Sequence, residues 1–250
     1  MRGSVLVVGA LLSIVPAAAG AQSVVPGINL HTPRISGPDT VVYQRTVTRA
    51  GRDTSAGTRT VVMRVTGGPG GTRLLEVEQR FPAGGGGEIV DTAVADLRTL
   101  RAVAHRSHQP TRTMRFDFGE SDAVGSVVLP GAAGDSVEAV RQSLGGPIFD
   151  SNVIDLVVAA LPLRPGFTVE LPFFIYERGG RVPMQVAVRE RAMVVFPVHG
   201  RRDVWIVTVG VPGAPATVWV DRETGAVLRI RYDIAARSIS FTDERLTRLS

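Results

Sequence analysis

The 250-residue sequence contains no cysteine and no lysine, so all 28 of its basic residues are arginine. Without cysteine the chain can form no disulfide bond, and its core alone has to stabilise the fold. A lipobox cysteine, the usual attachment point of a bacterial lipid anchor, is absent for the same reason. The absence of lysine excludes a P-loop lysine, a Schiff base and a Ser-Lys nucleophile.

Residues that bind metals or nucleic acids are scarce. There are only 4 histidines, and His105 and His108 lie three positions apart in the strand-like segment "AVAHRSHQ". An odd spacing sends them to opposite faces of a strand, so we predict a surface or structural role, with no metal and no cofactor. Aromatic residues make up 6% of the chain, and the arginines are interleaved with acids. This pattern argues against a nucleic-acid partner.

The chain begins with "MRGSVLVVGALLSIVPAAAGAQ". A basic residue, an apolar run and small residues in this order predict a secretory signal peptide over residues 1–21. A membrane anchor is the competing interpretation, but the apolar run is shorter than the roughly 20 residues that span a bilayer. Residues 22–40 are rich in proline and glycine and predict a flexible lead-in. We therefore expect an exported protein of the periplasm or cell envelope, with no membrane span after cleavage.

From residue 41 onward, apolar and polar side chains alternate in short segments separated by glycine-rich turns, which predicts antiparallel strands. In "VVYQRTVTR", for example, Val41, Tyr43 and Val47 share one face. Residues 153–161 have helical spacing instead, with Asp150 or Ser151 as the N-cap and Pro162 after the end. A second, weaker helix is expected from Asp135 to Leu144.

These segments predict a single domain over residues 41–250. Its fold class is mainly β (α+β): a large curved antiparallel sheet, or half-barrel, with one or two helices packed in the concave face.

No motif in the chain points to catalysis. The glycine-rich runs "TGGPGGT" and "AGGGGE" do not fit a phosphate-binding loop, and "GDSVE" lacks the second glycine of a nucleophile elbow. Asp221 and Glu223 in "VWVDRETGAVLRIRYD" could form a pair of catalytic carboxylates. Their position between two predicted strands, with Gly225 behind them, favours a hairpin turn. We therefore predict no catalytic residue and no enzyme activity.

Three segments resemble an uncharacterised family of exported bacterial proteins with a domain of unknown function. They are "GGPIFDSNVIDLVVAALPLRPGFTVELPFFIYE", "DVWIVTV" and "VWVDRETGAVLRIRYD". The earlier "EIVDTAVADLRTLRAVAHRSH" is also similar, with Ala102 where the family usually has proline. That family is similar to the half-barrel lipoprotein carriers of the LolA, LolB and LppX type. The resemblance implies a curved sheet around helices that encloses an apolar cavity, and no enzyme activity.

Two functions remain open at this point. One is a non-enzymatic envelope protein that binds a hydrophobic ligand, such as lipid or lipoprotein acyl chains, in the half-barrel. The other is a structural or protein-interaction module of the cell envelope without a small ligand. For the first, the predicted cavity lining is formed by Phe167, Val169, Leu171, Phe173, Trp205 and Trp219.

Overall fold

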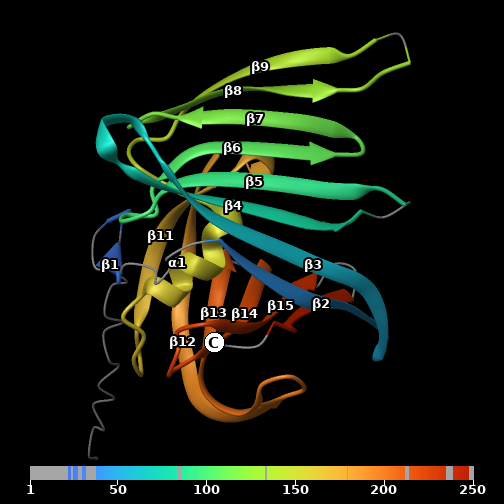
Figure 1. Cartoon of the computed structure of the whole chain (residues 1–250), viewed down its shortest axis with the longest axis vertical. Helices are drawn as coiled ribbons and strands as arrows, with labels where there is room; N and C mark the ends of the chain where they lie inside the picture. The colour runs from blue at the N-terminus through green and yellow to red at the C-terminus, as the bar shows by residue number, and fades with distance from the viewer. Residues whose placement is uncertain are drawn as a thin grey trace, which may run out of the picture.

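The computed structural model describes residues 22–23, 25–27, 30–31, 38–83, 86–132, 134–178, 180–211, 214–234 and 239–247. The predicted signal peptide, residues 1–21, lies outside these residues. Sixteen strands of the described chain form one sheet. Figure 1 shows that this sheet curves strongly around a short helix, α1 (Ile154–Ala160).

The sheet consists of two antiparallel meanders joined side by side. The first contains β2 (Asp39–Arg49), β3 (Arg52–Gly67), β4 (Arg73–Pro82), β5 (Glu88–Asp96), β6 (Ala102–Gln109), β7 (Arg112–Phe118), β8 (Asp122–Leu129) and β9 (Ser136–Ser143). The second contains β11 (Thr168–Ile175), β12 (Gly180–Phe196), β13 (Gly200–Val211), β14 (Ala214–Asp221), β15 (Val227–Ile234) and β16 (Ile239–Arg245). The last strand, β16, returns to pair with the first, β2. This seam between β16 and β2 makes one sheet out of two.

Short strands and an aromatic cluster bring the distant parts of the sheet together. β1 (Gln22–Ser23) and β10 (Phe149–Asp150) both pair in parallel with β11. Phe174 on β11 packs edge-on against Phe116 and Phe118 of β7, at centroid distances of 5.1 and 4.9 Å. The N–H of Ala102 at the start of β6 donates to the carbonyl of Ile148, just before β10. The sheet therefore curls until its two meanders touch, while β9 remains an edge strand.

The helix predicted before Pro162 is confirmed. A 3-10 turn, η2 (Ser151–Val153), leads into α1 (Ile154–Ala160). The carboxylate of Asp150 accepts a hydrogen bond of 2.8 Å from the N–H of Asn152, as expected of an N-cap. The same carboxylate lies 2.9 Å from Nδ1 of His105, and both side chains are buried. His108 is exposed, so the two histidines do occupy opposite faces of β6.

The second predicted helix, Asp135 to Leu144, is wrong. Ser136–Ser143 forms β9, which pairs with β8 along its whole length. Val137, Val140 and Leu144 have a helix-like spacing, but backbone pairing with a neighbouring strand overrides a weak local preference. Most β9 side chains are exposed, so the strand lacks the apolar alternation by which sequence analysis recognises strands.

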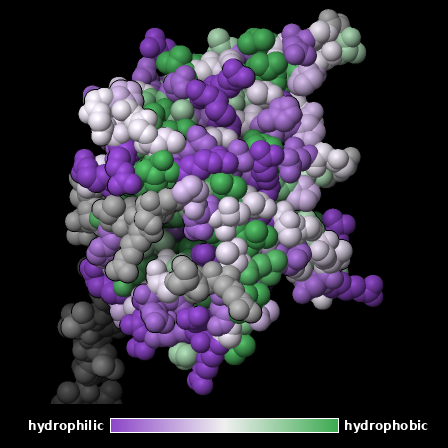
Figure 2. Space-filling view, in the orientation of Figure 1, coloured by the Kyte–Doolittle hydropathy of each residue, from purple (hydrophilic) through white to green (hydrophobic). Residues whose placement is uncertain are grey.

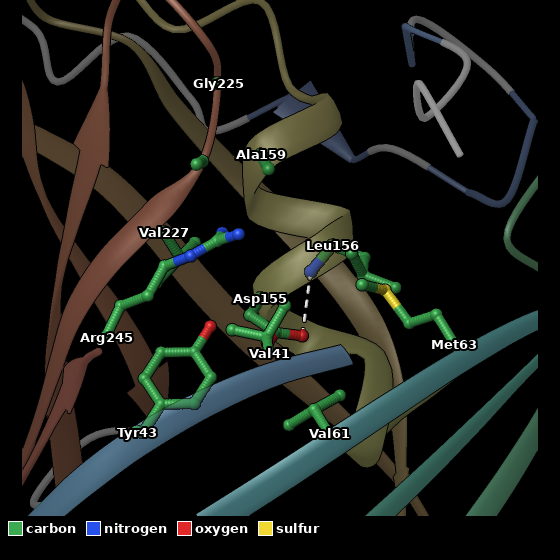
Figure 3. Close-up of a pocket in the computed structure, with 11 residues that line it drawn as sticks. Val41, Tyr43, Val61, Met63, Asp155, Leu156, Ala159, Gly225, Val227 and Arg245 are labelled. Atoms are coloured by element: carbon green, nitrogen blue, oxygen red, sulfur yellow. Dashed lines mark hydrogen bonds between the residues drawn. The ribbon is translucent and has the colours of Figure 1, made fainter. Parts of the chain in front are cut away.

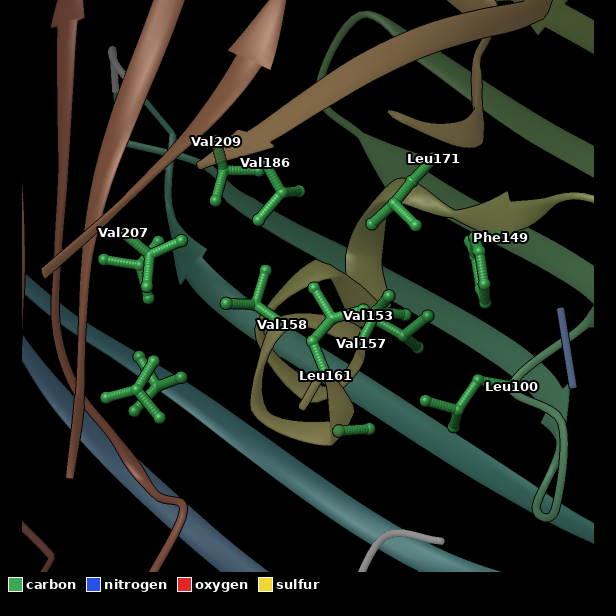
Figure 4. Close-up of a cluster of buried hydrophobic side chains, with 14 of the residues drawn as sticks. Leu100, Phe149, Val153, Val157, Val158, Leu161, Leu171, Val186, Val207 and Val209 are labelled. Carbon is green, nitrogen blue, oxygen red and sulfur yellow. The ribbon is translucent and has the colours of Figure 1, made fainter. Parts of the chain in front are cut away.

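The main core lies on the concave face, around α1. Figure 4 shows Val157 and Val158 pointing from the helix toward Val186 and Val207 of β12 and β13. Alternate residues of each strand reach this core, as the period of two requires. The architecture is thus mostly β, one open curved sheet with one short helix inside, which confirms the predicted half-barrel.

Parts of the predicted lead-in contact the domain. Gln22 and Ser23 are aligned with Val169 and Glu170 of β11. The N–H of His31 donates a 2.8 Å hydrogen bond to the carbonyl of Ala160, at the end of α1. The described residues of this segment therefore add a short edge strand to the sheet and contact the end of α1.

The packing predicts that Gly125 on β8 is required for stability. A Cβ atom at this position would lie 1.9 Å from the carbonyl oxygen of Arg115 on β7. Gly125→Ala should lower the free energy of unfolding by about 1–3 kcal/mol, as overpacking typically does. The matched control is Gly67→Ala at the end of β3, where a Cβ meets nothing within 4 Å. Urea unfolding of both variants checks this, and an equal effect at the two glycines would contradict it.

Candidate functional site

A small cavity lies between α1 and the wall formed by β2, β3 and β15. Its volume is about 80 Å³. The lining is mostly apolar, with polar groups at one side; its residues are Val41, Tyr43, Val61, Met63, Asp155, Leu156, Ala159, Gly225, Ala226, Val227 and Arg245. Figure 3 shows the helix residues facing the side chains of β2 and β3 across this space.

The helical and strand periods explain why these residues meet. Leu156 and Ala159 are three positions apart, so they share one side of α1. Val61 and Met63 are two positions apart on β3, so they share the concave face. The helix therefore packs into the core on one side and leaves the cavity on the other.

A buried cluster of charges lies beside the cavity. Asp243 on β16 is fully buried, and Arg45 on β2 donates to its carboxylate from Nε at 2.8 Å and from Nη2 at 3.2 Å. Arg59 on β3 approaches the same carboxylate, with Nε 3.4 Å from Oδ2. Nη2 of Arg59 lies 3.9 Å from Oδ2 of Asp155 on α1. One arginine thus connects the helix to the seam between the two meanders.

Arg59 is buried, with only 5% of its surface exposed, yet not all of its N–H groups have a hydrogen-bond partner. Its Nη1 donates to Gln79 over 3.4 Å, and its guanidinium lies 4.4 Å from the centre of the Tyr43 ring. Among the described residues, its Nε and Nη2 have no hydrogen-bond partner. Buried cations of this kind normally find one, and here the ion pairs of Arg59 with Asp243 and Asp155 lack hydrogen-bond geometry.

Burial controls the titration of the cavity's polar groups. Burial raises the pKa of Asp155 above its usual value, and the positive charge of Arg59 opposes this only in part. Burial likewise raises the pKa of Tyr43 well above its usual range, so its phenol stays neutral. Figure 3 shows the Tyr43 hydroxyl pointing toward the helix. The cavity therefore offers an apolar surface with a neutral phenol, a weakly acidic carboxyl and the Arg245 guanidinium at its edge.

The cavity lining offers mostly apolar contacts and few titratable groups. The lining contains no histidine and no serine, and Asp155 is its only carboxyl group. A nucleophile with an adjacent base, or a pair of carboxylates, is therefore missing from the cavity. Within the described part of the chain, no three His, Asp or Glu side chains gather closely enough to hold a metal ion.

The predicted turn at Asp221 is confirmed. Oδ1 of Asp221 accepts hydrogen bonds from the backbone N–H groups of Glu223 and Thr224, at 3.0 and 2.8 Å. It also accepts one from the Thr224 hydroxyl at 2.9 Å, and Gly225 has a φ of 74°. Glu223 is exposed at the tip. The two acids are therefore parts of a turn and do not face each other.

The six residues predicted to line a cavity are distributed differently. Phe167, Val169, Leu171 and Phe173 are buried in the main core, and Trp205 packs partly against it. Trp219 alternates with Val218 and Val220 and so lies on the opposite face, in a small cluster with Phe196, Val204 and Leu228. None of the six lines the cavity beside α1.

The polar residues of the site were not singled out from the sequence, although a signal was present. Arg59 has the same parity as Val61 and Met63, so alternation places a charge on an apolar strand face. Asp155 lies within the apolar run "VIDLVVAA" of the helix. A charged residue on a buried face is the observation that points to such a site.

The described residues define a half-barrel with a small apolar cavity beside its helix. Residues 42–241 match the family described as protein of unknown function (DUF3108), and the chain belongs to this family. No curated protein matches the chain.

Two solved structures resemble the chain in fold at low identity. One is a beta-barrel-like protein of domain of unknown function DUF1849 from Brucella abortus, with 14% identity and a TM-score of 0.45 over 86% of this chain and 97% of that one. The other is a putative exported protein with a YmcC-like fold from Bacteroides fragilis, with 13% identity and a TM-score of 0.33 over 89% and 100%. The similarity to the LolA, LolB and LppX carriers stays a prediction.

The raised pKa of Asp155 predicts how stability depends on pH. The folded pKa exceeds the unfolded value of about 4, so the folded state binds the proton more tightly, and the associated stability is lost as pH rises. Asp155→Asn removes this titration. The free energy of unfolding of the variant minus that of the parent should therefore increase as pH rises from about 4 toward neutrality.

Urea unfolding at a series of pH values measures this difference. Asp39→Asn, at the exposed start of β2, corrects for the general effect of losing one carboxylate. A difference that decreases as pH rises, or that Asp39→Asn reproduces, would contradict a raised pKa at Asp155.

Proposed function

We propose that the protein is a non-enzymatic binding protein that holds an acyl chain of a lipid or lipoprotein between α1 and the β2–β3 wall. The observation that carries this proposal is the apolar cavity between α1 and the β2–β3 wall. Val41, Val61 and Met63 form one wall of the cavity, and Leu156 and Ala159 form the other. An apolar concave surface with a few polar groups is the usual form of a small-molecule site.

The cavity has to enlarge when it binds a chain. Its volume of about 80 Å³ is several-fold below the roughly 300–1,000 Å³ of typical ligand pockets. On the β2–β3 side, α1 is held by the 3.9 Å contact between Asp155 and Arg59. A hydrogen bond from Gln79 on β4 to the carbonyl of Asn152 holds the preceding turn η2. Separating the helix from this wall costs few polar contacts, while its valines stay packed on β12 and β13.

The polar edge of the cavity suits an acidic headgroup. Arg245 lines the cavity, and within the described residues its Nε donates only to the carbonyl of Thr247, at 3.3 Å. A guanidinium at the edge of an apolar site can bind a carboxylate by two hydrogen bonds. The neutral Tyr43 phenol is a further donor on the same side.

Export to the periplasm or cell envelope is part of the proposal and is supported by the signal-peptide pattern of residues 1–21. In that compartment acyl chains belong to lipids and lipoproteins. Among the described helices, none is long and apolar enough to cross a membrane.

One observation favours the alternative, a protein-interaction module of the envelope. β9 has β8 on one side and no strand on the other among the described residues. Val137 on this edge strand is 67% exposed. Such an edge can accept a strand from a partner protein.

Purification from the native host separates the two functions. Lipid extracts of the protein should contain fatty acyl species by mass spectrometry, and the delipidated protein should take up a fluorescent fatty acid. A lipid-free protein that does not bind the probe would leave only the interaction module.

Filling the cavity should prevent uptake. Ala159→Met projects a longer side chain into the cavity and should weaken binding of the fluorescent fatty acid about tenfold or more. The matched control is Ala139→Met on β9, which is exposed and remote from α1. Thermal melts confirm that both variants fold. Equal affinities for the two variants would rule out this cavity as the site.

The headgroup assignment predicts a selective loss. Arg245→Gln should weaken binding of a fatty acid about tenfold and leave a fatty alcohol of the same length nearly unaffected, because only the acid forms a charged hydrogen bond. Competition against the fluorescent probe measures both affinities. Arg231→Gln, at a half-exposed arginine of β15, is the control. An equal loss for acid and alcohol would show that Arg245 supports the fold and does not bind the headgroup.

A further inference from the structure

The hairpin formed by β12 and β13 extends past the rest of the sheet at the lower end of the molecule in Figure 1, where it is coloured orange. Cross-strand pairing places three residue pairs on one of its faces. These pairs are Arg191 with Trp205, Met193 with Asp203, and Val195 with Arg201. We call these six residues the hairpin face.

Apolar side chains on and beside the hairpin face are unusually exposed. Met193 is 52% exposed and Val195 is 71% exposed, and Val198 in the turn is 38% exposed. Single exposed apolar residues are common on protein surfaces, but three within six positions of one hairpin form a cluster. In Figure 2, hydrophobic and strongly hydrophilic residues lie side by side at this lower end.

The opposite face of the same hairpin is packed, so the exposed residues cannot turn inward. Phe196 and Val204 are buried there against Leu228 of β15. The guanidinium of Arg229 lies 5.0 Å from the centre of the Phe196 ring and 5.5 Å from that of Trp219. The hairpin is thus held firmly, and Met193 and Val195 stay on the outside.

The charge of the hairpin face is positive. Its acid, Asp203, accepts hydrogen bonds from Arg191 at 2.8 Å and from Arg222, so two arginines offset one carboxylate. Arg201 is exposed beside Val195, and it forms no ion pair within the described residues. At the bulge of β12, exposed Arg189 is followed by exposed Glu190, so this position adds no net charge. Apolar side chains flanked by arginines are complementary to a surface that is apolar inside and anionic outside.

We propose that the hairpin face docks on an anionic lipid bilayer, with Val195, Val198 and Met193 inserted among the acyl chains and Arg201 at the phosphates. Arginine side chains that border a shallow apolar insertion bind anionic headgroups, and their stems lie along the apolar region. A protein partner or a second copy of the chain would be less dependent on anionic lipid. The inference stands on the hairpin and does not require the acyl-chain cavity.

The hairpin is nevertheless connected to the cavity through the turn that precedes β15. The N–H of Arg222 donates a 3.0 Å hydrogen bond to the carbonyl of Asp203 on the hairpin. The same turn carries Gly225, which lines the cavity. Docking would therefore turn the Gly225 end of the cavity toward the bilayer.

Because the chain has no cysteine, a single introduced cysteine can report on docking. Val195→Cys, produced in the native host and labelled with an environment-sensitive fluorophore, should brighten and shift to the blue on phosphatidylcholine vesicles that contain phosphatidylglycerol. The label should respond weakly to phosphatidylcholine alone and lose its response at high salt, because salt screens the arginines. Val137→Cys on β9 is a matched exposed valine away from the hairpin, and its label should stay silent.

Vesicle co-sedimentation gives the second measurement. Val195→Asp should weaken binding to the anionic vesicles about tenfold, and Val137→Asp should not. Ala159→Met should bind vesicles like the parent, which separates this inference from the cavity. Equal responses at Val195 and Val137, or a dimer in sedimentation velocity that Val195→Asp dissociates without any vesicle binding, would overturn the proposal.

Discussion

The structure depends on the seam where the last strand returns to the first, and there a fully buried carboxylate is held between two arginines. Asp243 on β16 accepts two hydrogen bonds from Arg45 on β2, and Arg59 on β3 completes the cluster. A buried charge is stable only when its partners neutralise it, so these strands must lie next to one another in this register. With no disulfide available, side-chain interactions at the seam and the apolar core hold the two meanders together.

The same cluster ties the helix to the sheet and creates the site. Arg59 lies between Asp243 and Asp155, so the seam and α1 share one buried cation. Asp155 is the weaker partner, because burial raises its pKa and its distance from Arg59 is long. The apolar cavity lies beside this longer contact, between α1 and the β2–β3 wall.

Local patterns in the sequence predicted the local structure well. The alternation of apolar residues indicated the strands, the spacing before Pro162 indicated α1, and "DRETG" was correctly interpreted as a turn. β9 was mistaken for a helix because its side chains are mostly exposed and its structure is imposed by β8. The candidate site depends on contacts across the seam, such as Arg45 with Asp243, which lie 198 positions apart. No local pattern contains that information.

The assignment of side chains to strand faces shows the same limit of local sequence patterns. Phe167 to Phe173 were correctly placed among apolar residues of one strand face, and they fill the core. Trp219 is predicted to line the same cavity, but the β14 alternation places it on the other face. The cavity could not be located from sequence, because it exists only where the helix fails to fill the space against β2 and β3.

Methionine methyl groups provide the most direct test of the central claim, that an acyl chain binds between α1 and the β2–β3 wall. Met63 lines the cavity, Met114 is buried beside Phe116 and Phe174, and Met193 lies on the hairpin. The NMR spectrum of the ¹³C-methyl-methionine protein, titrated with a fatty acid below its micelle concentration, should show a saturable shift at Met63 and none at Met114. A spectrum in which Met63 does not move, or in which only Met193 responds, would contradict the account.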